Sequence, residues 1–297
     1  MAGLITRFAP SPTGRLHLGH AFCALTASDL ARQSDGVFLL RMENIDTARA
    51  SPAFEAMIED DLRWLGLTWP VPVMRQSERG AAYDSALTRL DAMGVTYRCT
   101  CTRGDIRAAL AAPQEGVFVT GPDGPVYPGT CRDARHRAPD AAIRLDMRRA
   151  VALTGPVEFT ENGPLHPGTH RFDPDWLVAQ IGDFVLARRD IGTAYHLAVC
   201  VDDAEQGITL VTRGADLFDA TAIHAVLQRL LALPQPMYHH HRLIRDETGK
   251  RLAKRDDARS IAACRAAGAT PADIRATLGL QTSGAISSTS SPPCTAV

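Results

Sequence analysis

Two histidines in the segment PTGRLHLGH have a spacing that suits phosphate chemistry. His17 and His20 stand at a Gly-containing turn that opens a helical pattern. Imidazoles and backbone N–H groups would lie there beside the positive end of a helix dipole, an arrangement that binds a triphosphate. Such histidines donate hydrogen bonds to phosphoryl oxygens as charge develops, which stabilises a transition state without acid–base work. Paired histidines are also common on protein surfaces without a function. The spacing alone therefore leaves both a phosphate site and an ordinary surface pair open.

Lysine occurs at only two positions of the chain, Lys250 and Lys254, within GKRLAKRDDA. Lysine and arginine total 32, so the other 30 are arginine, which indicates a coding bias against lysine. Lysine carries a compact charge on a flexible stem, whereas guanidinium is a planar fork. A lysine kept for its chemistry, together with the two histidines, indicates nucleotidyl transfer. Chance retention on a solvated loop is the alternative.

Alternating strand and helix patterns provide the elements that would position these residues. The run at residues 3–10 is strand-like, residues 21–36 carry apolar side chains at helical spacing, and residues 37–46 are strand-like again. This order predicts an α/β fold with a parallel sheet, crossover helices and a site at the carboxyl ends of the strands. A further helix should begin at Pro52, with Ser51 as its N-cap.

The composition of the sequence changes after the first third. From about Cys99 to Gly168 it is rich in Gly and Pro with short apolar runs, which is typical of an inserted module. Strand and helix patterns return in WLVAQIGDFVLARRD, YHLAVCVDD and GITLVTRGADL, and ATAIHAVLQRLLAL is a predicted helix. The run HHHR, residues 239–242, is expected to be a solvated loop. Residues 281–297 contain few large apolar side chains and are expected to be disordered.

Composition limits the class of protein. At 297 residues, 45% hydrophobic and 22% charged, the chain can bury a substantial core in one large or two ordinary domains. A formal net charge of −1 means that any site for a polyanion must be local. Seven cysteines without a secretory signal indicate reduced thiols in the cytoplasm. No apolar run approaches the roughly 20 residues that span a bilayer, so no membrane partner is expected.

At these motifs the sequence resembles a known family. RFAPSPTGRLHLGH, residues 7–20, is similar to the HIGH region of class I glutamyl-tRNA synthetases, and RLAKR, residues 251–255, is similar to their KMSKS loop. LLRMENID, YHLAVCVDD and VTRGADL resemble further segments of that family. Its full-length members continue into a helical domain that reads the anticodon, for which this sequence has no room. It therefore resembles the truncated relatives, the glutamyl-queuosine tRNA(Asp) synthetases, over nearly its whole length.

The resemblance implies a fold and an activity. The implied fold is the Rossmann-like parallel sheet of class I synthetases, with a zinc-containing inserted module and a short helical C-terminal segment. The implied activity is ATP-dependent activation of L-glutamate, with Mg²⁺, and its transfer to queuosine at the wobble position of tRNA(Asp). The partners would be glutamate and queuosine-containing tRNA(Asp), and the enzyme is expected to be a cytoplasmic monomer.

The resemblance also implies roles for individual residues. Arg7 and Arg213 would bind the γ-carboxylate of glutamate, because a guanidinium fork suits bidentate pairing, and Glu43 would bind the α-ammonium group. Lys254 would stabilise the triphosphate from a mobile loop. The complete set comprises the substrate-binding residues Arg7, Ala9, Ser11, Glu43, Tyr195 and Arg213, and the ATP-binding residues His17, Gly19, His20 and Lys254, of which His17, His20 and Lys254 are catalytic.

A zinc site is implied in the inserted module. Cys99, Cys101, Tyr127 and Cys131 match the C-x-C and Y-x₃-C pattern of the truncated relatives, and such thiolates would satisfy tetrahedral zinc in a module with little apolar content. His136 is an alternative fourth ligand, and ordinary reduced cysteines are the other explanation. The remaining cysteines that lie in apolar patterns are expected in the core: Cys23, Cys200 and Cys264.

The predicted organisation follows from these assignments. Residues 1–98 and 171–245 would form the two halves of the nucleotide-binding domain. Residues 99–170 would be an inserted module like those that bind the tRNA acceptor end. Residues 246–280 would hold the KMSKS-like loop and a helical segment, and residues 281–297 would form the tail.

Two other functions compete with queuosine modification. A short synthetase that charges the 3′ end of a tRNA would share the chemistry, but the missing anticodon domain counts against it. A tRNA-binding paralogue without catalysis is disfavoured because HLGH and Lys254 are intact. Arg251 and Ala253 replace the first lysine and the serine of the KMSKS signature, so the role of Arg251 is less secure, and the retention of Lys250 is unexplained.

Overall fold

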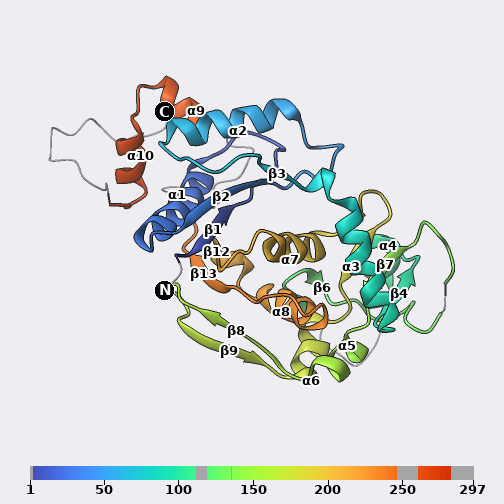
Figure 1. Cartoon of the computed structure of the whole chain (residues 1–297). Coiled ribbons are helices and arrows are strands. Elements are labelled where there is room, and N and C mark those ends of the chain that lie inside the picture. Colours follow the sequence, from blue (N-terminus) through green and yellow to red (C-terminus); the bar gives the residue numbers. More distant parts are fainter. Residues whose placement is uncertain (1–2, 112–118, 135, 246–259, 282–297) are drawn as a thin grey trace. The chain divides into compact units, whose positions relative to one another are not determined.

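The computed structural model describes residues 3–111, 119–134, 136–245 and 260–281. The chain divides into two compact units, each with its own hydrophobic core. Figure 1 labels the helices and strands along the chain. Unit 1 comprises residues 1–77, 209–215 and 239–297, and unit 2 comprises residues 78–208 and 216–238. Lys250, Arg251, Ala253, Lys254 and residues 282–297 lie outside the described residues.

The sheet of unit 1 is parallel, as the order of strand and helix patterns predicts. Strand β1 (Ile5–Phe8) lies between β2 (Val37–Met42) and β12 (Leu210–Gly214), and it pairs in parallel with both. Strand β3 (Met74–Arg75) pairs in parallel with β2, and β13 (Met237–His241) adjoins β12. Because β1, β2 and β12 run in one direction, their carboxyl ends meet at one edge, where class α/β folds bind ligands.

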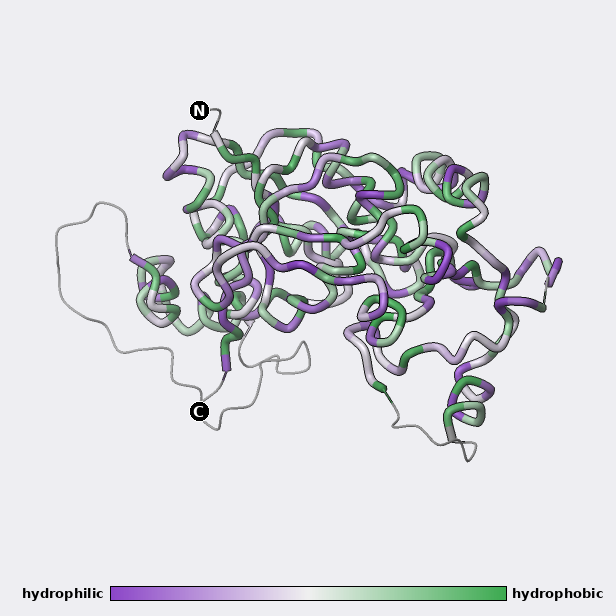
Figure 2. The backbone as a smooth tube through the Cα atoms, turned by 90° about the horizontal axis from the view of Figure 1, so that it is seen from below, coloured by the Kyte–Doolittle hydropathy of each residue, from purple (hydrophilic) through white to green (hydrophobic). Residues whose placement is uncertain are grey.

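Helices pack against this sheet and share one core with it. Helix α1 (Leu18–Gln33) contacts β1, β2 and β12. Helices α9 (Ile261–Ala266) and α10 (Pro271–Thr277) contribute buried residues to the same core. Figure 2 shows hydrophobic and hydrophilic residues alternating along the coiled segments, the pattern of helices that bury one face. The predicted short helical C-terminal segment is therefore present.

Helix α2 (Pro52–Trp64) begins where the sequence predicts. Ser51 is the N-cap, and its hydroxyl accepts a hydrogen bond from the backbone N–H of Ala53 at 3.2 Å. Pro52 takes the first helical position, where the missing N–H has no intrahelical partner to lose. The cap satisfies one of the unpaired donors of the first turn.

Unit 2 contains a four-stranded antiparallel sheet. Its order is β11 (Gly192–Thr193), β10 (Val185–Arg188), β7 (Ala142–Leu145) and β4 (Thr96–Cys99). Strand β7 pairs in antiparallel fashion with both β4 and β10. Strand β4 therefore ends at the first cysteine of the C-x-C pair.

Helices form the main core of unit 2. Helix α7 (Tyr195–Glu205) packs against α3 (Gly80–Ala92) and α8 (Thr221–Leu230), and α8 packs against α5 (Met147–Thr154). The predicted helix in ATAIHAVLQRLLAL is confirmed as α8. The smaller elements are α4 (Arg103–Ala111), the strand pair β5 (Thr120–Gly121) and β6 (Gly124–Pro125), the strand pair β8 (Val157–Glu161) and β9 (Gly168–Phe172), α6 (Pro174–Trp176), and one π-helical turn over Leu177–Ile181.

A buried polar network fastens α3 to α7 inside unit 2. The side chain of Asp202 is fully buried. It accepts hydrogen bonds from the Tyr83 hydroxyl at 2.8 Å and from Arg79 Nε at 3.1 Å. A buried carboxylate needs such donors, because an unpaired charge in the interior is strongly destabilising.

The prediction that three cysteines lie in the core is confirmed, whereas the prediction of a loop at HHHR is not. Cys200 and Cys264 are buried, and Cys23 is half-buried against the core of unit 1, so that expectation is confirmed. The expectation of a solvated loop at HHHR is wrong. Its histidines lie in strand β13, where His240 is 0% and His241 7% exposed. Local polarity suggested solvent, but the strand lies beside β12 in the sheet.

Candidate functional site

The carboxyl ends of β1 and β12 each carry a buried arginine. Arg7 is 5% exposed, and its Nη1 donates a hydrogen bond to the carbonyl oxygen of Thr212 at 3.2 Å. Arg213 is also 5% exposed, and its Nε donates to Nε2 of His240 at 3.1 Å. Since β1 and β12 are adjacent parallel strands, the structure brings these two predicted residues to one edge of the sheet. Two guanidinium groups at one edge have the geometry to pair with a carboxylate.

Glu43 follows the carboxyl end of β2 at the same edge. Its backbone N–H donates to the carbonyl oxygen of Pro10 at 2.9 Å, which ties it to the loop that leaves β1. Its carboxylate accepts a hydrogen bond from Nη2 of Arg41 at 3.1 Å, and the Arg41 side chain is 0% exposed. The sequence interpretation missed Arg41. The signal was present, because a charged residue inside the apolar run VFLLRM has to find a buried partner.

The two histidines of HLGH hold each other at the start of α1. His17 is the N-cap, and its Nδ1 accepts a hydrogen bond from the backbone N–H of Gly19 at 3.1 Å. Nδ1 of His20 accepts from the backbone N–H of His17 at 3.2 Å, and the two ring centroids are 3.8 Å apart. This is the reciprocal arrangement of a capping box, built from imidazoles. Because both Nδ1 atoms accept, each neutral ring carries its proton on Nε2, which can donate to a phosphoryl oxygen.

Gly19 allows this close arrangement. A Cβ at this position would lie 3.0 Å from Cε1 and 3.1 Å from Nδ1 of His17, tighter than ordinary contact. The segment after the KMSKS-like loop returns to the same place, because Ser260 forms a β-bridge with His17 and the N–H of Ile261 donates to Leu16 O at 2.9 Å. Ser260 and Ile261 are thus fixed beside the histidine motif.

Two further predicted residues lie in the loop between β1 and α1. Ala9 is half-buried and Ser11 is exposed. The carbonyl oxygen of Ser11 accepts a hydrogen bond from the N–H of Thr13 at 2.8 Å, which turns the chain. Lys254 lies outside the described residues, so its position relative to this loop stays a prediction.

Tyr195 belongs to unit 2, where it is the first residue of α7. It is 37% exposed. Its ring centroid lies 5.3 Å from that of His196 and 5.9 Å from that of His224. These contacts fix one side of the ring, and its role toward glutamate stays a prediction.

Three cysteines and a tyrosine converge in unit 2. The sulfur atoms of Cys99, Cys101 and Cys131 lie within 4.8 Å of one another, and those of Cys101 and Cys131 are 3.4 Å apart. The hydroxyl oxygen of Tyr127 lies 3.4 Å from Cys99 Sγ and 3.3 Å from Cys101 Sγ. A tetrahedral zinc with bonds of about 2.3 Å separates its sulfur ligands by roughly 3.8 Å, so these four atoms fit such an ion. His136 Nε2 lies 3.4 Å from the hydroxyl oxygen of Thr100.

The thiols of this cluster ionise differently. Burial opposes ionisation of Cys131, but hydrogen bonds from Tyr127 and from the backbone of Thr100 outweigh it and lower its pKa to about 6. Burial raises the pKa of Cys101 to about 11. A cluster with one thiolate already favoured suits a cation, because metal ligands must lose their protons on binding.

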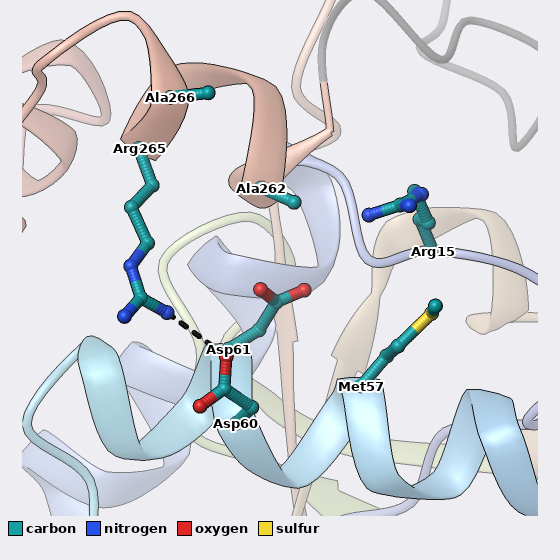
Figure 3. A pocket seen from close by; sticks show the side chains of 7 residues that line it. All are labelled: Arg15, Met57, Asp60, Asp61, Ala262, Arg265 and Ala266. Atoms are coloured by element: carbon teal, nitrogen blue, oxygen red, sulfur yellow. Dashed lines mark hydrogen bonds and ion pairs between the residues drawn. The ribbon is translucent and has the colours of Figure 1, made fainter.

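A pocket of about 400 Å³ in unit 1 holds none of the predicted site residues (Figure 3). Asp61 on α2 points into it, and Arg15 faces it from the segment that precedes HLGH. Asp60 forms an ion pair with Arg265 of α9 at 2.9 Å. Asp61 is only 4% exposed, although it borders the pocket.

Comparisons with known proteins bear on the family of this chain. The family model described as the catalytic domain of class I tRNA synthetases (E and Q) matches residues 3–285. A Glutamyl-Q tRNA(Asp) synthetase of Rhodobacter capsulatus is 59% identical over 282 residues, covering 93% of this chain and 100% of that protein. The chain belongs to the glutamyl-Q tRNA(Asp) synthetase family. A second member, from Geobacter sulfurreducens, is 44% identical over 88% of this chain and 79% of its own length.

Solved structures place this family member among class I synthetases. A glutamate-tRNA synthetase from Elizabethkingia anophelis matches with a TM-score of 0.67 and 28% identity. The match covers 86% of this chain and 53% of the other, so the chain spans about half the length of that enzyme. A methionyl-tRNA synthetase from Mycobacterium tuberculosis, 11% identical with a TM-score of 0.60, shares the fold. The predicted α/β Rossmann-like class is confirmed, and none of the helices in the described ranges is long and apolar enough to cross a membrane.

Proposed function

We propose that this chain activates L-glutamate with ATP and transfers it to the queuosine at the wobble position of tRNA(Asp). The observation that carries the proposal is the 59% identity over the full length of a Glutamyl-Q tRNA(Asp) synthetase. The geometry of unit 1 supports it, because two buried arginines, a glutamate and a histidine pair gather around the carboxyl ends of parallel strands.

In the proposed first step, the α-carboxylate of glutamate attacks the α-phosphorus of ATP and pyrophosphate leaves, giving a mixed anhydride. Mg²⁺ accompanies the ATP. His17 and His20 donate Nε2–H bonds to phosphoryl oxygens, which gain charge as the phosphorus becomes five-coordinate. Gly19 admits the triphosphate to the N-terminus of α1, and Lys254 adds a positive charge.

Glutamate is recognised by its two ends in this proposal. Arg7 and Arg213 bind the γ-carboxylate, and Glu43 binds the α-ammonium group. Arg41 holds the Glu43 carboxylate in place through the 3.1 Å bond. On the basis of the resemblance, Tyr195 adds a hydroxyl, and Ala9 and Ser11 line the substrate site.

In the second step, a hydroxyl of the cyclopentenediol ring of queuosine attacks the activated carbonyl and AMP leaves. The product is an ester of glutamate on the modified nucleoside. The enzyme would act as a monomer in the cytoplasm, which size-exclusion chromatography and cell fractionation would test.

A structural zinc ion is the proposed cofactor of unit 2. Cys99, Cys101, Cys131 and Tyr127 would hold it, because their ligand atoms already lie at distances that suit a tetrahedron. Elemental analysis should find about one zinc per chain in the wild type. Loss of metal in Tyr127→Phe but not in His136→Ala would support Tyr127 as the fourth ligand, and the opposite result would favour His136.

The function is tested by transferring labelled glutamate onto bulk tRNA from cells that do or do not make queuosine. Nuclease mapping should place the label in the anticodon fragment of queuosine-containing tRNA alone. Label at the 3′-terminal adenosine in both pools would identify a short conventional synthetase instead. No label in either pool would indicate a binding protein without catalysis.

A further inference from the structure

His240 is a fully buried histidine that the proposed chemistry does not use. It lies on β13 at 0% exposure, inside a histidine run whose sequence suggested solvent. Strand β13 adjoins β12, which carries Arg213. The Nε–H of Arg213 donates to Nε2 of His240 at 3.1 Å. A buried residue of the proposed glutamate site is therefore held by an imidazole.

The direction of this hydrogen bond defines the state of the ring. Arginine has no acceptor, so Nε2 of His240 must present its lone pair. The neutral ring then carries its proton on Nδ1. Both side chains are almost completely buried, at 5% and 0% exposure, so water does not replace the bond when it is lost.

We propose that His240 is a positioning residue that sets the rotation of the Arg213 guanidinium group. With Nε bound to His240, the rotation about the last bonds of Arg213 is fixed and the terminal Nη1 and Nη2 edge points in one direction. That edge matches a carboxylate in the bidentate geometry. The proposal rests on the proposed function, in which Arg213 binds the γ-carboxylate of glutamate.

The choice of histidine over a carboxylate has a physical reason. A neutral imidazole accepts the hydrogen bond without cancelling the positive charge of Arg213. An aspartate or glutamate in its place would form an ion pair and weaken the attraction for the γ-carboxylate of the substrate. Arg41 shows the contrast in the same unit, because its charge is paired with the carboxylate of Glu43 at 3.1 Å. His240 therefore orients Arg213 through a partner that adds no negative charge of its own.

Three substitutions separate positioning from packing. In His240→Gln the amide oxygen reaches about as far as Nε2, so the acceptor is retained. In His240→Asn the shorter side chain places its oxygen nearer the position of Nδ1, and His240→Leu removes the acceptor. His239→Leu is the matched control, because neighbouring residues of a strand point to opposite faces. His239 is half-buried, and melting temperatures would show which variants fold.

Glutamate-dependent ATP–pyrophosphate exchange is the first readout. His240→Leu should raise KM for glutamate by about 10-fold to 30-fold, with kcat and KM for ATP changed by less than about 3-fold. His240→Asn should resemble it, while His240→Gln should stay within about 3-fold of the wild type. Equal KM values in the Leu variant and the wild type would overturn the proposal. So would a Gln variant as impaired as the Leu variant.

The Arg213 Nε–H signal in ¹⁵N NMR gives a readout independent of catalysis. It should be protected from solvent exchange in the wild type and in His240→Gln, and exposed or broadened in His240→Leu. Equal protection of the Arg213 Nε–H in the wild type and in His240→Leu would refute the positioning role. A wild type that shows the protected signal but no glutamate-dependent exchange would refute the proposed function and leave the hydrogen bond established.

Discussion

Asp61 allows a direct test of the electrostatics around the pocket between α2 and α9. Its side chain faces the pocket, at 4% exposure of the residue (Figure 3). Burial raises the pKa of Asp61 to about 6, and the negative charge of Asp60 adds to this, while Arg15 and Arg265 oppose it. We predict that Asp61→Asn stabilises the protein near neutral pH, because the amide avoids the ionisation that the site disfavours.

The raised pKa of Asp61 sets the free-energy cost of ionising its carboxyl in the folded protein. The ordinary value is 3.8, and the difference from about 6 corresponds to about 3 kcal/mol when the carboxyl is fully ionised. Because the folded-state pKa is raised, protonated Asp61 contributes to the free energy of unfolding. This contribution is complete below pH 3.8 and is lost as the pH rises through 6. Water in the open pocket hydrates part of the charge, so an effect of about 1–2 kcal/mol is the expectation.

Urea unfolding at about pH 5 and about pH 7.5 measures the effect. The stability advantage of Asp61→Asn over the wild type should grow by about 0.3–1 kcal/mol between these pH values, because part of the penalty is already present at pH 5. Asp60→Asn is the matched control, because its ion pair with Arg265 is largely exposed and should contribute less than about 1 kcal/mol at either pH. An advantage of Asp61→Asn that is the same at both pH values would show that the carboxylate is not disfavoured by burial.

Three further changes test other parts of the chain. Gly19→Ala should reduce glutamate-dependent pyrophosphate exchange by about 5-fold, because its Cβ would displace the His17 ring from 3.0 Å; unchanged exchange would contradict the tight packing. Cys131→Ser, or treatment with a strong chelator, should release the metal and lower the melting temperature, measured by calorimetry beside metal analysis; an unchanged transition would argue against a structural ion. Tyr83→Phe should cost about 1–3 kcal/mol in urea unfolding, because the buried Asp202 carboxylate loses a 2.8 Å hydrogen bond; a cost near zero would mean that Asp202 finds another donor.

The sequence predicted those strands and helix starts that are encoded by residues close together in the chain. The parallel strands β1 and β2 follow from apolar runs separated by a helical period, and α2 begins at Pro52 because Ser51 and the proline carry the capping signal themselves. The HLGH segment predicted a helix start with two imidazoles, but not that the rings cap the helix themselves. That detail depends on backbone geometry, which composition does not encode.

The missed features depend on neighbours that are distant in the sequence. His240 looked solvated because three consecutive histidines are polar, yet β12 supplies Arg213 as its partner. Arg41 was visible as a charge within an apolar strand, but its partner Glu43 was assigned only to substrate. Both cases show that a buried polar residue is identified by its partner, and long-range strand pairing decides which partner it meets.

The histidine cap at the start of α1 puts a structural role and the proposed phosphate contact in the same two side chains, with Nδ1 serving the cap and Nε2 the contact. Replacing either histidine removes a helix cap and a ring donor together, so the loss of activity in such a variant has two sources that cannot be separated by rate alone. Asparagine at position 17 would divide them, because its side-chain oxygen can cap the helix while the Nε2–H donor is gone. A substitution at position 17 or 20 is therefore constrained twice, by the start of α1 and by the proposed phosphate contact.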